Sequence, residues 1–199
     1  MSESRGVRPW RRERSEAGPS YRIFDVRLDH LENPRNGEVL ERVVLEGPDW
    51  VNVVARTDDG ALVVIRQYRF GVQAITCEIP GGLIDPGEDS RTAAERELRE
   101  ETGYEATRWT YLGHVEPNPA FQDNLCHHWL AEGAVCSGER SLDVGEDIDV
   151  TTLTEEEVRA AIANGEMRHS LALLALSRVY DLRDTSFEVR PLWAKDKRG

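Results

Sequence analysis

The sequence predicts an α/β fold, in which a mixed β-sheet is sandwiched between helices. Two observations lead to this expectation. Several strand patterns are accompanied by only two or three helical patterns, and the two kinds do not alternate strictly along the chain. The chain has 199 residues, which is enough for one sizeable hydrophobic core. We therefore expect one main domain with helices against its sheet.

The first 47 residues are expected to form an arm followed by a β-hairpin. Residues 1–19 are polar and rich in Arg, Ser and Glu, which is typical of a flexible arm. Within residues 20–47, the strand patterns Tyr21–Leu28 and Val39–Leu45 flank an Asn-Gly pair at 36–37. Asn-Gly favours a tight turn because both residues tolerate a left-handed backbone. This segment is expected to precede the main domain as a separate β-unit.

The main domain is expected over residues 48–183, with a polar tail over residues 184–199. A capping box, in which Glu157 follows Thr154 by three residues, marks the start of one helix. Gly103 suits the left-handed conformation that ends many helices. The strand patterns are Trp50–Arg56, Ala61–Tyr68, Thr110–Val115 and Asn124–Glu132, and the helical patterns run from Asp89 or Ser90 to Gly103, from Leu153 to Asn164 and from Ser170 to Leu182.

The composition excludes several classes of function. The formal net charge is −12, whereas non-specific binding to DNA or RNA requires a basic surface. No apolar run approaches the length of a membrane span, and the N-terminus lacks the apolar core of a signal peptide. The three cysteines, Cys77, Cys126 and Cys136, show no Cys-x-x-Cys spacing. We therefore expect a reduced, cytoplasmic protein that binds neither nucleic acid nor membranes.

An acidic cluster lies on the first predicted helix, after a glycine turn. Glu97, Glu100 and Glu101 stand at positions i, i+3 and i+4, so they project from one side of the helix. Their mutual repulsion costs about a few tenths of a kcal/mol per pair on an exposed helix. A hard divalent cation such as Mg²⁺ would relieve it, because such ions prefer carboxylate oxygens. Taken alone, the cluster is more typical of a solvated acidic face than of a metal site.

The spacing within Gly82–Tyr104 resembles the Nudix box. The one departure is Tyr104, where the family usually has an aliphatic residue that packs rather than reacts. The resemblance implies a Nudix fold and hydrolysis of a nucleoside diphosphate linked to another group, with Mg²⁺ or Mn²⁺ as cofactor. The matching positions are Gly82, Glu88 after five intervening residues, Arg96-Glu97-Leu98 after seven more, Glu100-Glu101 and Gly103.

The resemblance also implies roles for individual side chains. Glu97 and Glu101 would be the central metal ligands, with help from Glu100 and from the backbone carbonyl of Gly81. Arg96 and Glu88 would brace the loop against the helix through a salt bridge, although Glu88 could also reach a metal through water.

A glutamate outside the box is the expected general base. In the resembling family, a glutamate in a later loop approaches the metals as base or as an extra ligand. Glu146 aligns best with it, through the run Gly-Glu-Asp-Ile, and Asp143 and Asp147 are the reserves. A carboxylate beside metal ions would stay ionised and accept a proton from the attacking water. The alternative is an acidic loop without a catalytic role.

The residues flanking the box narrow the range of expected substrates. Residues 66–69, Arg-Gln-Tyr-Arg, and 78–82, Glu-Ile-Pro-Gly-Gly, resemble the segment before the box in ADP-ribose pyrophosphatases and nucleoside diphosphate-sugar hydrolases. Pro119 lies sixteen residues after Gly103, near a position at which ADP-ribose pyrophosphatases carry a proline, although the Pro-Gly version common in that group is absent. A turn without a substrate role is the alternative.

Three further side chains are candidates for substrate binding. Arg69 could bind a phosphate bidentately, and Glu78 could pair with an arginine or accept a hydrogen bond from a ribose hydroxyl. A surface ion pair is the alternative for both. Trp50 could stack on a nucleobase, although a core position is typical of such a residue.

The sequence thus predicts a magnesium-dependent pyrophosphatase that cleaves ADP-ribose or a related nucleotide-sugar into a nucleoside monophosphate and a sugar phosphate. Another Nudix substrate is the first alternative: a dinucleoside polyphosphate, NADH or an oxidised nucleotide. A Nudix module that senses a nucleotide without hydrolysing it is the second. In ADP-ribose pyrophosphatases, the segment before the main domain commonly exchanges between subunits, which implies a homodimer.

Overall fold

The computed structural model describes residues 6–138, 140–142 and 144–182. The tail expected over residues 184–199 and the reserve base Asp143 lie outside the described residues. Within the described part of the chain, no helix is long and apolar enough to cross a membrane.

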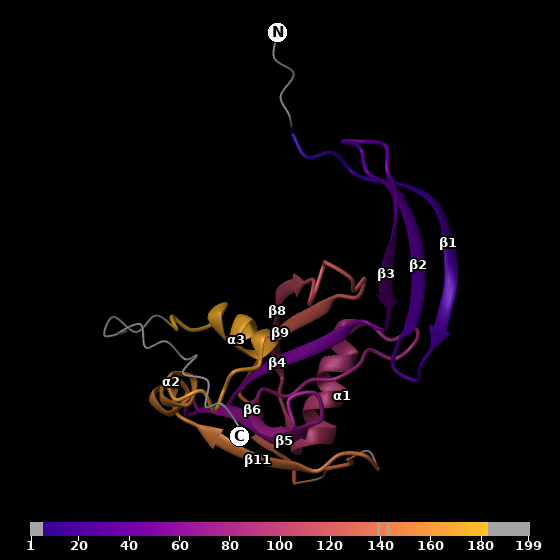
Figure 1. The fold of residues 1–199 in the computed structure, drawn as a ribbon. Helices are drawn as coiled ribbons and strands as arrows, with labels where there is room; N and C mark the ends of the chain where they lie inside the picture. The colour runs from indigo at the N-terminus through magenta and orange to yellow at the C-terminus, as the bar shows by residue number, and fades with distance from the viewer. Residues whose placement is uncertain (1–5, 139, 143, 183–199) are drawn as a thin grey trace, which may run out of the picture.

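A mixed sheet forms the centre of the main domain, as the sequence predicts (Figure 1). Its strands follow the order β11-β5-β4-β9-β8, and β6 pairs with β5. The β4–β9 pair is parallel, whereas the other pairs are antiparallel. The bounds are β4 (Trp50–Arg56), β5 (Leu62–Arg69), β6 (Ala74–Glu78), β8 (Arg108–Val115), β9 (Cys126–Glu132) and β11 (Ile148–Leu153); β7 (Tyr104–Glu105) and β10 (Val135–Cys136) form a separate two-stranded sheet.

Helices pack on both faces of this sheet, because successive strand residues point to opposite sides and both sets are apolar. Helix α1 (Ser90–Thr102) covers one face, and α2 (Glu155–Ala163) and α3 (Ser170–Ser177) contribute to the core on the other (Figure 1). The α1 side buries Val51, Val53, Ala55, Val63, Ala93, Ala94 and Leu98. The opposite side buries Val54, Leu62, Val64, Val158, Ala161, Met167, Ala172, Ala175 and Leu176.

Helix boundaries follow the capping residues. Asp89 caps α1 by accepting hydrogen bonds from two backbone N–H groups of the first turn, and Gly103 ends the helix with a φ of 71°. The capping box between Thr154 and Glu157 opens α2. Helix α3 ends at Ser177, earlier than the expected Leu182; the next residue, Arg178, donates hydrogen bonds to backbone carbonyls of β8.

A second, three-stranded antiparallel sheet projects from the main domain (Figure 1). It contains β1 (Arg11–Ser20), β2 (Asp25–Glu32) and β3 (Val39–Glu46). The expectation of a flexible arm is therefore wrong from Arg11 onward. Strand β1 is held against β2 by polar cross-strand pairs rather than by burial of apolar side chains. Arg11 Nε donates to Glu32 at 3.1 Å, and Arg12 lies 3.5 Å from Asp29.

Candidate active site

The glycine turn at residues 81–82 runs directly along β4. The N–H of Val53 donates to the carbonyl of Pro80 at 2.8 Å, and the N–H of Val51 donates to that of Gly82 at 2.9 Å. A Cβ on Gly81 would lie 2.1 Å from the carbonyl oxygen of Val51, and one on Gly82 would lie 2.4 Å from the Glu97 carboxyl carbon. A side chain at position 81 would collide with the backbone of β4, whereas one at position 82 would displace the Glu97 carboxyl group from the turn.

Helix α1 presents its acidic side to this turn because its apolar side is fixed against the sheet. Ala93, Ala94 and Leu98 are fully buried in the core. Glu97 therefore comes to lie over the turn, whereas Glu101 stays 3% exposed at the border with the core. The N–H of Gly81 donates to Glu101 Oε2 at 2.9 Å, so the turn and the helix are directly joined.

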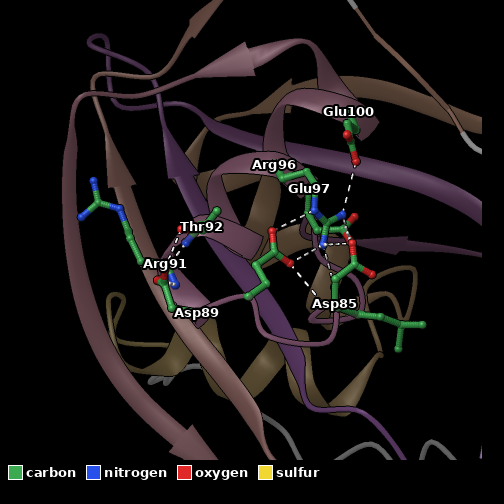
Figure 2. Close-up of polar contacts among 9 residues, drawn as sticks. Asp85, Asp89, Arg91, Thr92, Arg96, Glu97 and Glu100 are labelled. Carbon is green, nitrogen blue, oxygen red and sulfur yellow. Dashed lines mark hydrogen bonds and ion pairs between the residues drawn. The ribbon is translucent and has the colours of Figure 1, made fainter.

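The guanidinium group of Arg96 donates hydrogen bonds to several carboxylates at once (Figure 2). It donates to the two oxygens of Glu88 at 3.0 and 2.8 Å, and to Glu97 at 2.8 Å. It also donates to Glu100 at the longer distance of 3.3 Å and to the backbone carbonyl of Leu83 at 2.9 Å. The salt bridge between Arg96 and Glu88 that the sequence predicts is thus present, and it ties the loop before α1 to the helix.

The two innermost glutamates resist ionisation. Burial raises the pKa of Glu97 to about 7, against the opposing pull of Arg96. Burial also raises the pKa of Glu101 well above its ordinary value, although the hydrogen bond from Gly81 favours the ionised form. Ionisation of these two carboxyl groups is therefore disfavoured by burial more than their present hydrogen bonds and nearby cations favour it.

Glu146 belongs electrostatically to the same centre. Its negative charge contributes to the raised pKa values of both Glu97 and Glu101, and it also acts on Arg69. The long loop after β10 thus carries an exposed carboxylate towards the buried pair on α1.

The donor set fits a hard divalent cation. Carboxylate oxygens are the ligands that Mg²⁺ prefers, and a bound cation would favour the ionised forms of Glu97 and Glu101, which burial disfavours. Among the residues that the structure describes, however, no three His, Cys, Asp or Glu side chains already converge as a metal site. Arg96 forms ion pairs with Glu88, Glu97 and Glu100, whereas Glu101 accepts a hydrogen bond from the backbone N–H of Gly81.

Arg69 and Glu78 form an ion pair beside this centre. Arg69 donates to both oxygens of Glu78, at 2.9 and 2.7 Å, and Thr76 donates to the same carboxylate at 2.6 Å. Burial opposes ionisation of Glu78, which is 2% exposed, but these hydrogen bonds outweigh it and lower its pKa. Arg69 uses Nε and Nη2 for this pair, and no described residue occupies its Nη1 group.

His169 is a member of this cluster that sequence reasoning missed. Its Nδ1 lies 3.5 Å from Glu78 Oε2. It does occupy the N-cap position of α3, without a side-chain capping bond. Its neighbour Glu78 is 91 positions earlier in the chain, so no local pattern could have indicated the contact.

The other two substrate candidates, Trp50 and Pro119, occupy different places in the fold. Trp50 is half-buried at the start of β4, where its backbone pairs with Cys126 and Leu83. Pro119 is exposed in a turn whose backbone is hydrogen-bonded to β3: the N–H of Leu45 donates to the carbonyl of Phe121 at 2.7 Å. The Pro119 turn thus links the main domain to the projecting sheet.

Comparison with known proteins agrees with this geometry. The model of the NUDIX domain matches residues 48–174. The chain is 32% identical over 178 residues to an ADP-ribose pyrophosphatase of Bacillus subtilis (strain 168), covering 89% of each chain. It is 31% identical over 172 residues to an ADP-ribose pyrophosphatase of Mycobacterium tuberculosis (strain ATCC 25618 / H37Rv), covering 85% of this chain and 83% of that one.

A solved structure shows the same fold. The crystal structure of an ADP compounds hydrolase superposes with a TM-score of 0.76 at 25% identity, covering 88% of this chain and 95% of that one. The matched family model spans the sheet, the glycine turn and α1 with its acidic cluster. The chain therefore belongs to the NUDIX domain family and is a Nudix pyrophosphohydrolase related to the ADP-ribose pyrophosphatases.

Proposed function

We propose that the protein hydrolyses the pyrophosphate bond of ADP-ribose or a related nucleoside diphosphate-sugar in a Mg²⁺-dependent reaction. Water adds across the phosphoanhydride, and the products are a nucleoside monophosphate and a sugar phosphate. The observation that carries the proposal is the placement of Glu97 and Glu101 of α1 against the glycine turn at residues 81–82. Two relatives that span most of the chain are named ADP-ribose pyrophosphatases, which supports the substrate class.

The residues divide into three roles in this proposal. Glu97, Glu101, Glu100 and the Gly81 backbone would hold the divalent cation, which neutralises phosphate charge and lowers the pKa of a bound water. Glu146 takes the proton of the attacking water, since its exposed carboxylate can reach solvent. Arg96 and Glu88 hold the loop and the helix in register and act as positioning residues.

Arg69 and Glu78 support recognition of the substrate. The Glu78 carboxylate fixes the plane of the Arg69 guanidinium through two parallel hydrogen bonds. The remaining Nη1 group can then donate to a phosphate or ribose oxygen without rearrangement of the side chain. Trp50 and Pro119 remain proposals for contacts with the base and the sugar.

A substrate panel tests the assignment. ADP-ribose, nucleotide-sugars, a dinucleoside polyphosphate, NADH, an oxidised nucleotide and a nucleoside triphosphate are assayed with Mg²⁺ in ¹⁸O-labelled water. We expect turnover of ADP-ribose or a nucleotide-sugar, with the label in one of the two phosphate products. Turnover of the triphosphate alone would assign the chain to another Nudix activity, and binding without turnover would favour a sensing module.

We further propose a cytoplasmic homodimer in which the projecting sheet contributes to the interface. Several apolar side chains of this segment are more than 45% exposed in the single chain: Tyr21, Ile23, Val39 and Val43. Burial of such a surface stabilises an oligomer. Light scattering at micromolar concentration should give the mass of two chains, and a monomeric mass would contradict the proposal.

A further inference from the structure

The ring of His169 approaches the ion pair of Arg69 and Glu78 from the N-terminal end of α3. Its Nδ1 lies 3.5 Å from Glu78 Oε2, the same oxygen that accepts from Arg69 Nη2 at 2.7 Å. This nitrogen is buried, and among the residues that the structure describes it has no hydrogen-bond partner. The contacts proposed above between the ion pair and the substrate make no use of this ring.

The backbone before His169 is anchored to β6, which fixes the ring beside Glu78. The N–H of Cys77, the neighbour of Glu78, donates to the carbonyl of Glu166 at 3.3 Å, and Met167 is 1% exposed in the core. His169 follows at the N-cap of α3, where Ser, Thr, Asp or Asn would bond to an N–H of the first turn. Its side chain makes no such capping bond and contacts Glu78 instead.

The Glu78 carboxylate requires hydrogen-bond donors because it is 2% exposed and its lowered pKa keeps it ionised at neutral pH. Its Oε1 accepts from Arg69 Nε at 2.9 Å and from Thr76 at 2.6 Å. The described residues give Oε2 one hydrogen bond, from Arg69 Nη2. Each oxygen of a carboxylate can accept two. His169 Nδ1 therefore lies where a fourth donor would complete the set.

The position of the proton on the His169 ring follows from these surroundings. Burial lowers the pKa of His169, so the ring is neutral at neutral pH and carries its proton on one nitrogen only. A bare Nδ1 would place two buried acceptors 3.5 Å apart, whereas an Nδ1–H group directs a donor at the carboxylate. The favoured form is thus the neutral Nδ1–H tautomer.

We propose that His169, through an Nδ1–H donor, is a positioning residue that holds Glu78 and thereby fixes the Arg69 guanidinium for the substrate. The proposal rests on the function proposed above, since it takes Arg69 to bind a phosphate or ribose oxygen of the nucleotide. Without the His169 donor, the Glu78 carboxylate turns towards its remaining donors, and Arg69 adopts more than one orientation. The contacts run from His169 through Glu78 to Arg69 and include no metal-binding carboxylate, so the effect falls on substrate binding.

The tautomer of His169 can be measured without substrate or metal. Long-range ¹H–¹⁵N correlation spectra of ¹⁵N-labelled protein at pH 7.5 separate protonated from unprotonated ring nitrogens. The signals that are absent from the spectrum of a His169 variant belong to His169. We expect a protonated Nδ1 and an unprotonated Nε2, and the opposite tautomer would overturn the proposal.

Two substitutions at His169 then separate the donor from the ring. The amide nitrogen of Asn lies close to the place of Nδ1, whereas that of Gln lies close to the place of Nε2. His169→Gln therefore loses the donor to Glu78 and should raise KM for ADP-ribose about tenfold, with kcat within about twofold. His169→Asn keeps the donor and should leave KM within about twofold of wild type. His114→Gln, at an exposed histidine on β8, is the matched control and should change neither constant.

The outcomes distinguish this role of His169 from a structural one. An unchanged KM in His169→Gln would overturn the proposal. Equal rises of KM in both variants would show that the ring stabilises α3 and does not act as a donor, which would overturn it too. Wild-type protein that hydrolyses neither ADP-ribose nor a nucleotide-sugar would instead refute the proposed function, while the spectra would still report whether His169 directs a donor at Glu78.

Discussion

At the scale of single residues, buried ionisable groups carry the most information. Glu101 and His128 are 3% and 0% exposed, yet neither is neutralised in the way that Glu78 is by Arg69. A buried ionisable group that lacks a compensating charge lowers stability, so its presence calls for a functional explanation. For Glu101 the proposed purpose is metal binding, whereas neither ring nitrogen of His128 has a hydrogen-bond partner among the residues that the structure describes.

Glu101→Gln should separate activity from stability. The amide keeps the shape of the side chain and can still accept from the Gly81 N–H, so the fold should be retained. Burial raises the pKa of Glu101, so removing its charge should leave the melting temperature equal or higher. Loss of a metal ligand should lower kcat by a factor on the order of 100 or more.

The exposed Glu95 on the same helix provides the matched control, because Glu95→Gln removes the same charge from a surface pair with Arg91. This variant should change kcat by no more than about twofold and should leave the melting temperature nearly unchanged. Retention of activity within a few-fold in Glu101→Gln would exclude Glu101 as a key ligand.

Because the His128 side chain is buried, we expect the protein to lose stability in weak acid. Burial lowers its pKa to about 4, helped by the charges of Arg178 and His127, whereas an unfolded histidine titrates near 6.5. Between these values the unfolded chain binds a proton that the folded chain excludes, so stability is full above 6.5 and falls as the pH drops towards 4. The loss is up to about 3 kcal/mol.

Urea unfolding of wild type and His128→Leu between pH 7.5 and 4.5 measures this effect. The variant should lose stability less steeply than wild type over that interval. Parallel slopes would show that other groups cause the acid sensitivity.

At the scale of elements, signals that are local in the chain were predictable from the sequence, and contacts between distant segments were not. The caps of α1 and α2 and the box itself are contiguous patterns, so their residues could be identified. Strand β1 was missed because polar cross-strand pairs, not apolar alternation, hold it. Strand β6 was missed because it is short and ends in the buried Glu78, whose partners Arg69 and His169 come from other elements.

Gly82→Ala should disable the site without unfolding the domain. The new methyl group would meet the Glu97 carboxyl group at 2.4 Å and displace it from the turn. We expect kcat to fall about tenfold or more, because catalysis is sensitive to displacements on the order of 1 Å. Far-ultraviolet circular dichroism should be unchanged.

Gly71→Ala is the control for this variant, since a Cβ there would meet no atom within 4 Å. Equal activity of Gly82→Ala and wild type would show that Glu97 can move without consequence.

At the scale of the whole molecule, charge is the dominant feature. The chain carries a net charge of −12, and its centre gathers carboxylates whose pKa values are raised by burial. A divalent cation that binds the folded state alone should therefore raise the melting temperature by a few degrees at saturation. The measurement compares MgCl₂ with NaCl at equal ionic strength.

The Glu97→Gln, Glu101→Gln double variant should lose this difference between the two salts. If it responds to Mg²⁺ as wild type does, the ion acts on the acidic surface in general and not on this centre.

The turn at residues 81–82 has a consequence for how firmly the site is held. Since the amides of Val51 and Val53 bond to this turn, the same hydrogen bonds that complete the sheet also fix the site. Both valines are fully buried, so their amide protons should exchange with deuterium only through a large opening of the domain. The positions of the carboxylates are then as stable as the folded domain itself. Core mutations that destabilise β4 should therefore loosen the site in proportion.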